Sequence, residues 1–155
     1  MIFPEVSGQN LEFENFNLPY NLEGTLNLVI IPFRRWHQNL LDEWSFHLNN
    51  LEKKYSNFKY YEIPTLNKGY KVMRFMIDGG MRSGIPDKAV RKRTITLYVN
   101  KTPFKKKLKI RSEDTIYLFL MNKNGEIIWR SEGRFDKNKF QSLEEYIKKQ
   151  ESLNF

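Results

Sequence analysis

The first half of the chain alternates strand-like and helix-like apolar patterns. Residues 26–33 form an apolar run without alternation, which is typical of a central strand buried on both faces. The apolar residues that follow recur every three or four positions, so they predict a helix with one buried face. These residues are Trp36, Leu40, Trp44, Leu48, Leu51 and Tyr55. Residues 58–63 predict a second strand, and Pro64 fits its end.

The middle of the chain predicts a helix, a strand and a second, short helix. Residues 70–81 have helical apolar spacing, and either Gly79-Gly80 or Gly84 is expected to end the helix. The apolar residues of this helix are Val72, Phe75 and Met76. Residues 94–99 are rich in β-branched side chains and predict a strand. Residues 103–109 predict a short basic helix with two inward-facing residues. These are Phe104 and Leu108.

Hairpins are predicted at both ends of the chain. Residues 11–13 and 16–18 read as a short N-terminal hairpin, and residues 115–121 and 126–131 flank a strong turn signal. That turn is Asn122-Lys123-Asn124-Gly125. Residues 137–149 predict a final helix with one apolar face, formed by Phe140, Leu143, Tyr146 and Ile147. The order of elements predicts an α/β protein with a central mixed sheet and helices on both faces. At 155 residues we expect one domain.

Basic residues gather in one window of this domain, which has the character of an insertion. Residues 88–111 contain ten Lys or Arg and no Asp or Glu. The rest of the chain holds 16 basic and 18 acidic residues, so the excess behind the formal net charge of +8 lies in this window. Charge of one sign favours an acidic partner, an anionic lipid surface or nucleic acid, and the alternative is a solvated face without a partner. We expect an acidic or membrane-associated client protein, with nucleic acid as the alternative. The predicted binding lysines are Lys101, Lys105, Lys106, Lys107 and Lys109.

Several stretches of the sequence resemble one protein family. The N-terminal stretches Phe3-Pro4, Leu11-Glu12, Leu18-Pro19, Leu22-Glu23-Gly24 and Leu28-Val29-Ile30-Ile31 resemble those of peroxiredoxin-like proteins with a thioredoxin fold. FRRW at 33–36, GMRSGI at 80–85, TITLY at 94–98 and LFLMNKNGEIIWR at 118–130 look like the mitochondrial ATP synthase assembly-factor family. The resemblance extends from about Phe3 to Lys149 and implies a thioredoxin-like fold. It also implies an assembly or chaperone role for a membrane subunit of ATP synthase.

The chain lacks the residue on which thioredoxin chemistry depends. In a thioredoxin-like fold the nucleophilic cysteine lies at the junction between the first central strand and its helix. This sequence contains no cysteine, and the junction holds Trp36, His37 and Gln38. A cis-proline loop is also missing, since residues 111–114 before the next strand read Arg-Ser-Glu-Asp. Because disulfide exchange requires a thiolate, we predict a binding protein without thiol oxidoreductase activity.

The same junction is a candidate binding site. Arg34, Arg35, Trp36, His37 and Gln38 lie where a strand leads into a helix N-terminus. Free backbone N–H groups and two guanidinium groups favour a carboxylate or phosphate there. The alternative is that the tryptophan packs in the core, the arginines are solvated and the histidine caps the helix. An enzyme that acts on an anionic small molecule at this loop is the second alternative, although no motif names its reaction.

Other polar residues give weaker signals. Asp78 and Arg82 are spaced for an ion pair within a helix, or for a polar pocket with the Arg34–His37 loop. His37 and His47 are too far apart to share a metal, about 15 Å along one helix, so we predict neither metal nor cofactor. Ser83 lacks the motif of a catalytic serine.

The ends of the chain and its apolar runs bear on location. No apolar run reaches the roughly 18 residues that span a bilayer, and the first residues lack the features of a secretory signal. We therefore expect a cytoplasmic protein. The alternative is a peripheral membrane position in the mitochondrial matrix, if a targeting segment has been removed.

Overall fold

The computed structural model describes residues 1–153, which form eight strands, five α-helices and two 3-10 turns. The strands are β1 (Val6–Asn10), β2 (Asn15–Leu18), β3 (Leu26–Ile31), β4 (Phe58–Glu62), β5 (Thr65–Asn67), β6 (Ile95–Val99), β7 (Tyr117–Asn122) and β8 (Ile127–Glu132). The helices are α1 (Gln38–Lys54), α2 (Arg74–Gly84), α3 (Lys88–Arg93), α4 (Lys101–Lys107) and α5 (Lys137–Leu153), and the 3-10 turns are η1 (Arg35–His37) and η2 (Lys68–Met73).

The strands form two four-stranded sheets. The central sheet has the order β4-β3-β7-β8, in which β3 runs parallel to β4 and antiparallel to β7. All six residues of β3 are buried, as its largely apolar sequence without alternation predicts. The second sheet has the order β2-β1-β6-β5. A single parallel bridge between Glu62 and Thr94 links the end of β4 to the start of β6.

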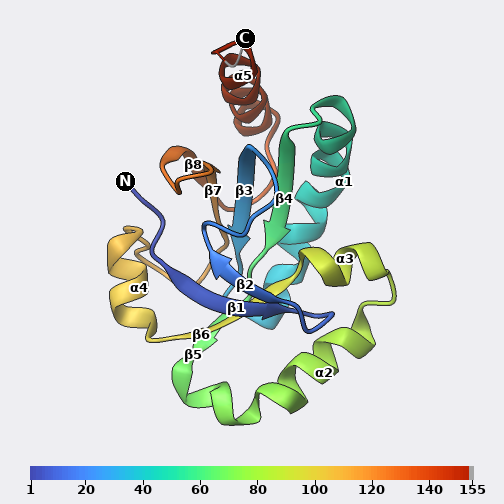
Figure 1. Cartoon of the computed structure of the whole chain (residues 1–155), viewed down its shortest axis with the longest axis vertical. Helices are drawn as coiled ribbons and strands as arrows, with labels where there is room; N and C mark the ends of the chain where they lie inside the picture. Colours follow the sequence, from blue (N-terminus) through green and yellow to red (C-terminus); the bar gives the residue numbers. More distant parts are fainter. Residues whose placement is uncertain (154–155) are drawn as a thin grey trace.

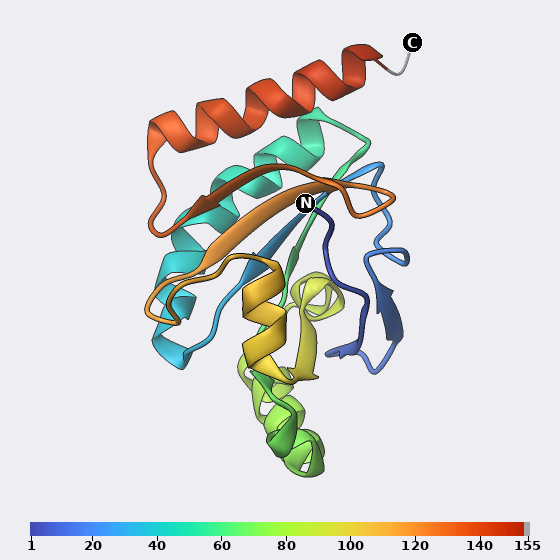
Figure 2. The same ribbon diagram turned by 90° about the vertical axis from the view of Figure 1, so that its left-hand side faces the viewer.

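Two hydrophobic cores cover the two faces of the central sheet. On one face, Leu28 and Ile30 of β3 pack with residues of α1 and α5 that include Trp44 and Leu143. On the other face, Val29 and neighbouring strand residues pack with the second sheet and α4. Figures 1 and 2 show α5 and α1 on one side of β3 and β7, with α4 and β6 on the other. The predicted α/β class with helices on both faces is confirmed.

The N-terminal hairpin exists, but its first strand was predicted too late in the sequence. Residues 6–10 pair with residues 15–18, so the predicted strand 11–13 lies in the turn. The Asn10 side-chain oxygen accepts hydrogen bonds from the backbone N–H groups of Glu12 and Glu14, at 3.0 and 2.9 Å. Phe13 has a φ of 62°. This local turn chemistry overrides the strand propensity of the apolar residues.

The predicted helix of residues 36–55 begins two residues later than its apolar pattern. Trp36 lies in η1 before α1 and is 52% exposed, so its assignment to the buried face is wrong. His37 is buried in its place, because the tight 3-10 turn directs the next side chain inward. A second exception is Tyr146 of α5, which is exposed although Leu143 and Ile147 on the same helix are buried.

The 3-10 turn η2 and helix α2 form where a helix was predicted, but the apolar residues predicted for its buried face are exposed to solvent. Val72, Phe75 and Met76 are exposed, and the one buried residue of α2 is Asp78. In contrast, Phe104 and Leu108 are buried as predicted for the short basic helix. The periodicity of residues 70–81 therefore identified the helix and not the direction of its apolar face.

Candidate functional site

A large cleft opens beside the strand-to-helix junction. It has a volume of about 950 Å³ and lies between the ends of β3 and β4, the start of α1, and helices α2 and α3. Its apolar wall includes Leu41, Leu66, Met81 and Ile85. Its polar residues are Arg34, Arg35, Gln38, Asp42, Glu62, Thr65, Asp87 and Thr94. In open α/β sheets ligands bind at this carboxyl edge of the strands, so the junction predicted as a binding site borders a real cleft.

His37 is a structural residue of the junction. Its Nδ1 accepts hydrogen bonds from the backbone N–H groups of Phe33 and Arg34, at 3.0 and 3.2 Å. Burial and the nearby Arg34 guanidinium lower the pKa of His37, which favours the neutral ring with its proton on Nε2. Nε2 is buried without a hydrogen-bond partner within residues 1–153. The ring thus fixes the loop that leads into α1 and does not face the cleft.

The other junction residues differ in their hydrogen bonds and ion pairs. Arg34 donates from Nε to the Glu113 carbonyl at 3.0 Å, and its Nη2 lies 3.4 Å from Asp114 Oδ1. Gln38 donates to Asp42 Oδ1 at 2.9 Å across the first turn of α1. Arg35 is exposed at the mouth of the cleft and makes no ion pair with any described residue. Arg35 is therefore the guanidinium most available to a ligand.

The cleft contains a buried carboxyl group that sequence reasoning missed. Glu62, at the end of β4, is 4% exposed and lines the cleft. Burial raises the pKa of Glu62 to about 7, which the nearby Arg93 opposes in part. Ser45 Oγ lies 3.5 Å from Glu62 Oε1. A carboxyl with this pKa in a cleft is typical of functional sites. The sequence contained one indication of this site, because Glu62 is a single acidic residue between apolar neighbours just before Pro64.

Asp78 and Arg82 do not form the predicted ion pair. Asp78 accepts hydrogen bonds from the hydroxyls of Thr96 and Tyr98, at 3.0 and 2.6 Å, and pairs with Arg74. Arg82 instead pairs with Glu12 in the hairpin turn. Neither residue lines the cleft, so the predicted polar pocket with the Arg34–His37 loop is also wrong. Contacts between distant segments replace the local i, i+4 pair.

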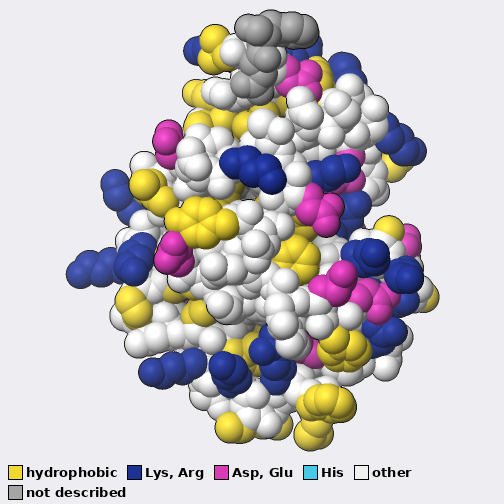
Figure 3. Space-filling model, in the orientation of Figure 1, with side chains coloured by type: hydrophobic (Ala, Val, Ile, Leu, Met, Phe, Trp, Pro, Cys, Tyr) yellow, Lys and Arg dark blue, Asp and Glu magenta, His cyan; other side chains and the backbone are white. Residues whose placement is uncertain are grey.

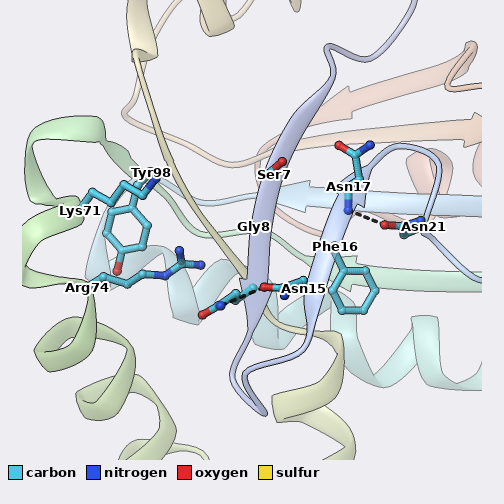
Figure 4. A pocket seen from close by; sticks show the side chains of 10 residues that line it. Ser7, Gly8, Asn15, Phe16, Asn17, Asn21, Lys71, Arg74 and Tyr98 are labelled. Carbon is cyan, nitrogen blue, oxygen red and sulfur yellow. Dashed lines mark hydrogen bonds between the residues drawn. The ribbon is translucent and has the colours of Figure 1, made fainter.

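A second, smaller hollow has polar walls. It measures about 280 Å³ and lies between the N-terminal hairpin and η2. Figure 4 shows Lys71, Arg74 and Tyr98 on one side and the hairpin residues Ser7 and Asn15 on the other. Some of the polar groups here already have hydrogen-bond partners within the protein. The Gln9 amide donates to Asn15 at 2.9 Å, and the Tyr98 hydroxyl donates to Asp78.

The two histidines lie in separate parts of the structure. No group of three His, Cys, Asp or Glu side chains within residues 1–153 is arranged to hold a metal ion. His47 stacks on Phe135 with ring centroids 4.0 Å apart, as expected for a histidine at the edge of the core. Ser83 donates its hydroxyl proton to the Gly79 carbonyl within α2.

The basic window is partly neutralised within the molecule. Lys101 and Lys105 both pair with Glu113, at 2.9 and 2.6 Å. Three arginines of the window also pair with glutamates elsewhere: Arg91 with Glu12, Arg93 with Glu52 and Arg111 with Glu132. Among the predicted binding lysines, Lys106, Lys107 and Lys109 are exposed and have no acidic partner among residues 1–153. The positive field around residues 88–111 is therefore weaker than the ten basic residues of the window suggest.

These contacts predict different results for adjacent lysines of α4. We expect the double variant Lys106→Glu/Lys107→Glu to change the free energy of unfolding by no more than about 0.5 kcal/mol, as is usual at exposed positions. Lys105→Glu should cost about 1 kcal/mol, because it removes a partner of Glu113 and adds a like charge beside it. Urea unfolding at low salt measures both values. Equal losses in the two variants would contradict the Lys105–Glu113 assignment.

Comparisons with known proteins identify the fold. Etrx1, a thioredoxin lipoprotein of Streptococcus pneumoniae, is similar with a TM-score of 0.59 and 14% identity, over 92% of this chain and 99% of that one. Copper-bound yeast Sco1 gives a TM-score of 0.60 and 15% identity, over 95% of this chain and 88% of that one. A thiol-disulfide oxidoreductase of Bacteroides fragilis gives 0.58 and 14%, over 95% and 99%. These likenesses show a thioredoxin-like fold.

No helix within residues 1–153 is long and apolar enough to cross a membrane.

The family follows from the sequence itself. No curated protein matches the chain. The family model described as ATP10 protein matches residues 1–149, which confirms the resemblance seen in the sequence. The chain belongs to the ATP10 protein family, which is linked to the assembly of ATP synthase.

Proposed function

We propose that this protein is a redox-inactive assembly factor that holds an apolar segment of an ATP synthase subunit in the cleft. The observation that carries this proposal is the cleft itself, with its wall of Leu41, Leu66, Met81 and Ile85 beside the strand-to-helix junction. Apolar walls with a few polar groups suit an extended or helical peptide segment. The exposed Arg35 at the mouth suits a carboxylate that flanks such a segment.

The absence of cysteine separates this role from that of the structural neighbours. The Bacteroides fragilis neighbour is a thiol-disulfide oxidoreductase, whereas this sequence contains no cysteine to form a thiolate. The lack of a thiolate supports a role of the cleft in binding without covalent exchange. The family link to mitochondrial ATP synthase assembly favours the mitochondrial location over the cytoplasmic one.

The two alternative functions have less support. The nucleic-acid alternative depends on a strong basic surface, yet five of the ten basic residues in 88–111 pair with glutamates. The enzyme alternative depends on a reactive group at the Arg34–His37 loop. His37 is buried there, and its Nδ1 is occupied by two backbone N–H groups.

Two adjacent glycines of α2 provide a matched test of the cleft. Gly80 lines the cleft and Gly79 does not, and a side chain added at either position meets no atom within 4 Å. We expect Gly80→Trp to fill part of the cleft and to lower the amount of assembled ATP synthase several-fold in cells that depend on this protein. Gly79→Trp should support assembly as the wild type does. Native gels measure the assembled complex, and immunoblots confirm equal amounts of each variant.

The outcome distinguishes client binding from a purely structural role of the cleft. Purified Gly80→Trp should unfold at the same denaturant concentration as Gly79→Trp, since both positions have open space. Full assembly activity in a folded Gly80→Trp variant would contradict the proposed role of the cleft. Reduction of insulin disulfides by the wild-type protein would contradict the redox-inactive part of the proposal.

A further inference from the structure

The segment formed by η2 and α2 presents its apolar side chains to solvent. Val72 is 93% exposed, Phe75 is 88% exposed and Met76 is 73% exposed. Tyr70 and Met73 in the same segment are also exposed. Figure 2 shows α2 projecting from the body of the protein, away from α5. Five neighbouring apolar residues exposed to water form a patch of the kind that marks an interaction site.

The outward orientation of this patch is fixed by a polar network on the inner side of α2. Asp78 is 3% exposed and accepts hydrogen bonds from Thr96 and Tyr98 of β6. Arg74, one turn earlier on α2, pairs with Asp78 at 3.5 Å and lies over the Tyr98 ring. Rotating the helix to bury Phe75 would break this network and leave Asp78 without its partners. Such a loss is expensive for a buried carboxylate, so the apolar face stays outside.

Cations lie among the exposed apolar residues. Lys68 and Lys71 of η2 are exposed, and Arg74 is half-buried. The acidic residue of the stretch 63–86 is Asp78, which is buried. Figure 3 shows the hydrophobic side chains at the lower end of the molecule, with Lys and Arg side chains close above them. The exposed surface of this segment is thus apolar and positive, without an exposed carboxylate.

We propose that the η2–α2 segment inserts its apolar side chains into the surface of an anionic lipid bilayer. Helices that lie in a membrane interface bury an apolar face among the acyl chains, while their cations contact anionic headgroups. Val72 and Phe75 lie outside the cleft, and the exposed Lys68 and Lys71 beside them complement anionic headgroups, which favours a bilayer as the partner. The short apolar tip and the few cations would each bind a bilayer only weakly, so stable membrane binding requires both together.

This inference does not depend on the client of the cleft. Val72 and Phe75 do not line the cleft, whereas Met76 does. A bilayer bound at this tip would lie next to the mouth of the cleft, because α2 forms one wall of it. The two proposals therefore fail separately. Loss of lipid binding leaves the cleft unchanged, and a filled cleft leaves Val72 and Phe75 exposed.

Vesicle flotation with the purified full chain tests the proposal. We expect the wild type to bind vesicles that contain phosphatidylglycerol, and to bind phosphatidylcholine vesicles at least tenfold more weakly. Val72→Ser/Phe75→Ser should weaken binding to the anionic vesicles at least tenfold. Phe46→Ser is the matched control, since Phe46 of α1 is also 69% exposed. It should bind as the wild type does.

A charge pair completes the test. Lys68→Glu/Lys71→Glu should weaken binding to anionic vesicles at least tenfold, whereas Lys148→Glu/Lys149→Glu, exposed on α5, should have much less effect. Circular dichroism and urea unfolding establish that each variant is folded. Three results would each overturn the proposal. These are no vesicle binding by the wild type, full binding by a folded Val72→Ser/Phe75→Ser variant, or a loss of vesicle binding in the control variants as large as in the variants of the η2–α2 segment. A protein partner would then be the better occupant of this surface.

Discussion

We expect Trp44→Ala to lower the free energy of unfolding by about 3–5 kcal/mol. Trp44 lies in the middle of α1 and is fully buried in the core between the central sheet, α1 and α5. Its Nε1 donates a hydrogen bond to the Gly133 carbonyl at 3.0 Å, and its ring meets Phe135 edge-on. The alanine variant loses the buried apolar surface, leaves a cavity and removes the donor for Gly133.

Trp36 provides the control for this prediction. The two tryptophans are eight residues apart in the sequence, but Trp36 is 52% exposed in η1. We expect Trp36→Ala to cost no more than about 1 kcal/mol, as is usual for partly exposed side chains. Guanidinium unfolding followed by circular dichroism compares both variants, because each substitution alters the tryptophan fluorescence. Similar losses in the two variants would contradict the assigned packing of α1.

The sequence predicts the elements of the central sheet well, because their patterns are local and strong. The largely apolar run of β3 and the Asn122–Gly125 turn between β7 and β8 each specify one structure. The apolar spacing along α1 identifies its buried face from Leu40 onward. These features need no knowledge of distant contacts, so a single sequence is sufficient to predict them.

The rest depends on contacts between segments far apart in the chain. The direction of α2 is set by Thr96 and Tyr98, which lie about 20 residues later and bond to Asp78. The charge of the basic window is reduced by Glu12, Glu52, Glu113 and Glu132, three of them outside it by many residues. At the candidate site, the sequence predicted the loop with Arg34 and Arg35, because it follows a strand. The opposite wall came from α2 and α3, and Glu62 gave too weak a signal.

Glu62 gives the protein a stability that should fall as the pH rises. Burial raises the pKa of Glu62 from 4.5 to about 7, so the folded chain keeps a proton that the unfolded chain releases between these values. A state that binds the extra proton is favoured at low pH. The stabilising contribution is therefore complete below about pH 4.5 and is lost by the time the pH passes about 7. Above that value, both states are ionised, and burying the carboxylate costs about 3 kcal/mol.

Glu62→Gln removes this dependence, because the amide is uncharged at every pH. We expect the variant to exceed the free energy of unfolding of the wild type by no more than about 1 kcal/mol at pH 5 and by about 2–4 kcal/mol at pH 8. Glu145→Gln, at an exposed position of α5, removes one carboxylate without burial and should show no such change with pH. Urea unfolding at both pH values gives the two differences, in which the other titrating groups cancel. If the gain of Glu62→Gln were the same at pH 5 and pH 8, the carboxyl group would not be held neutral by burial. A gain confined to high pH would mean that the fold accepts a less stable residue at the base of its cleft, as proteins do at sites kept for binding.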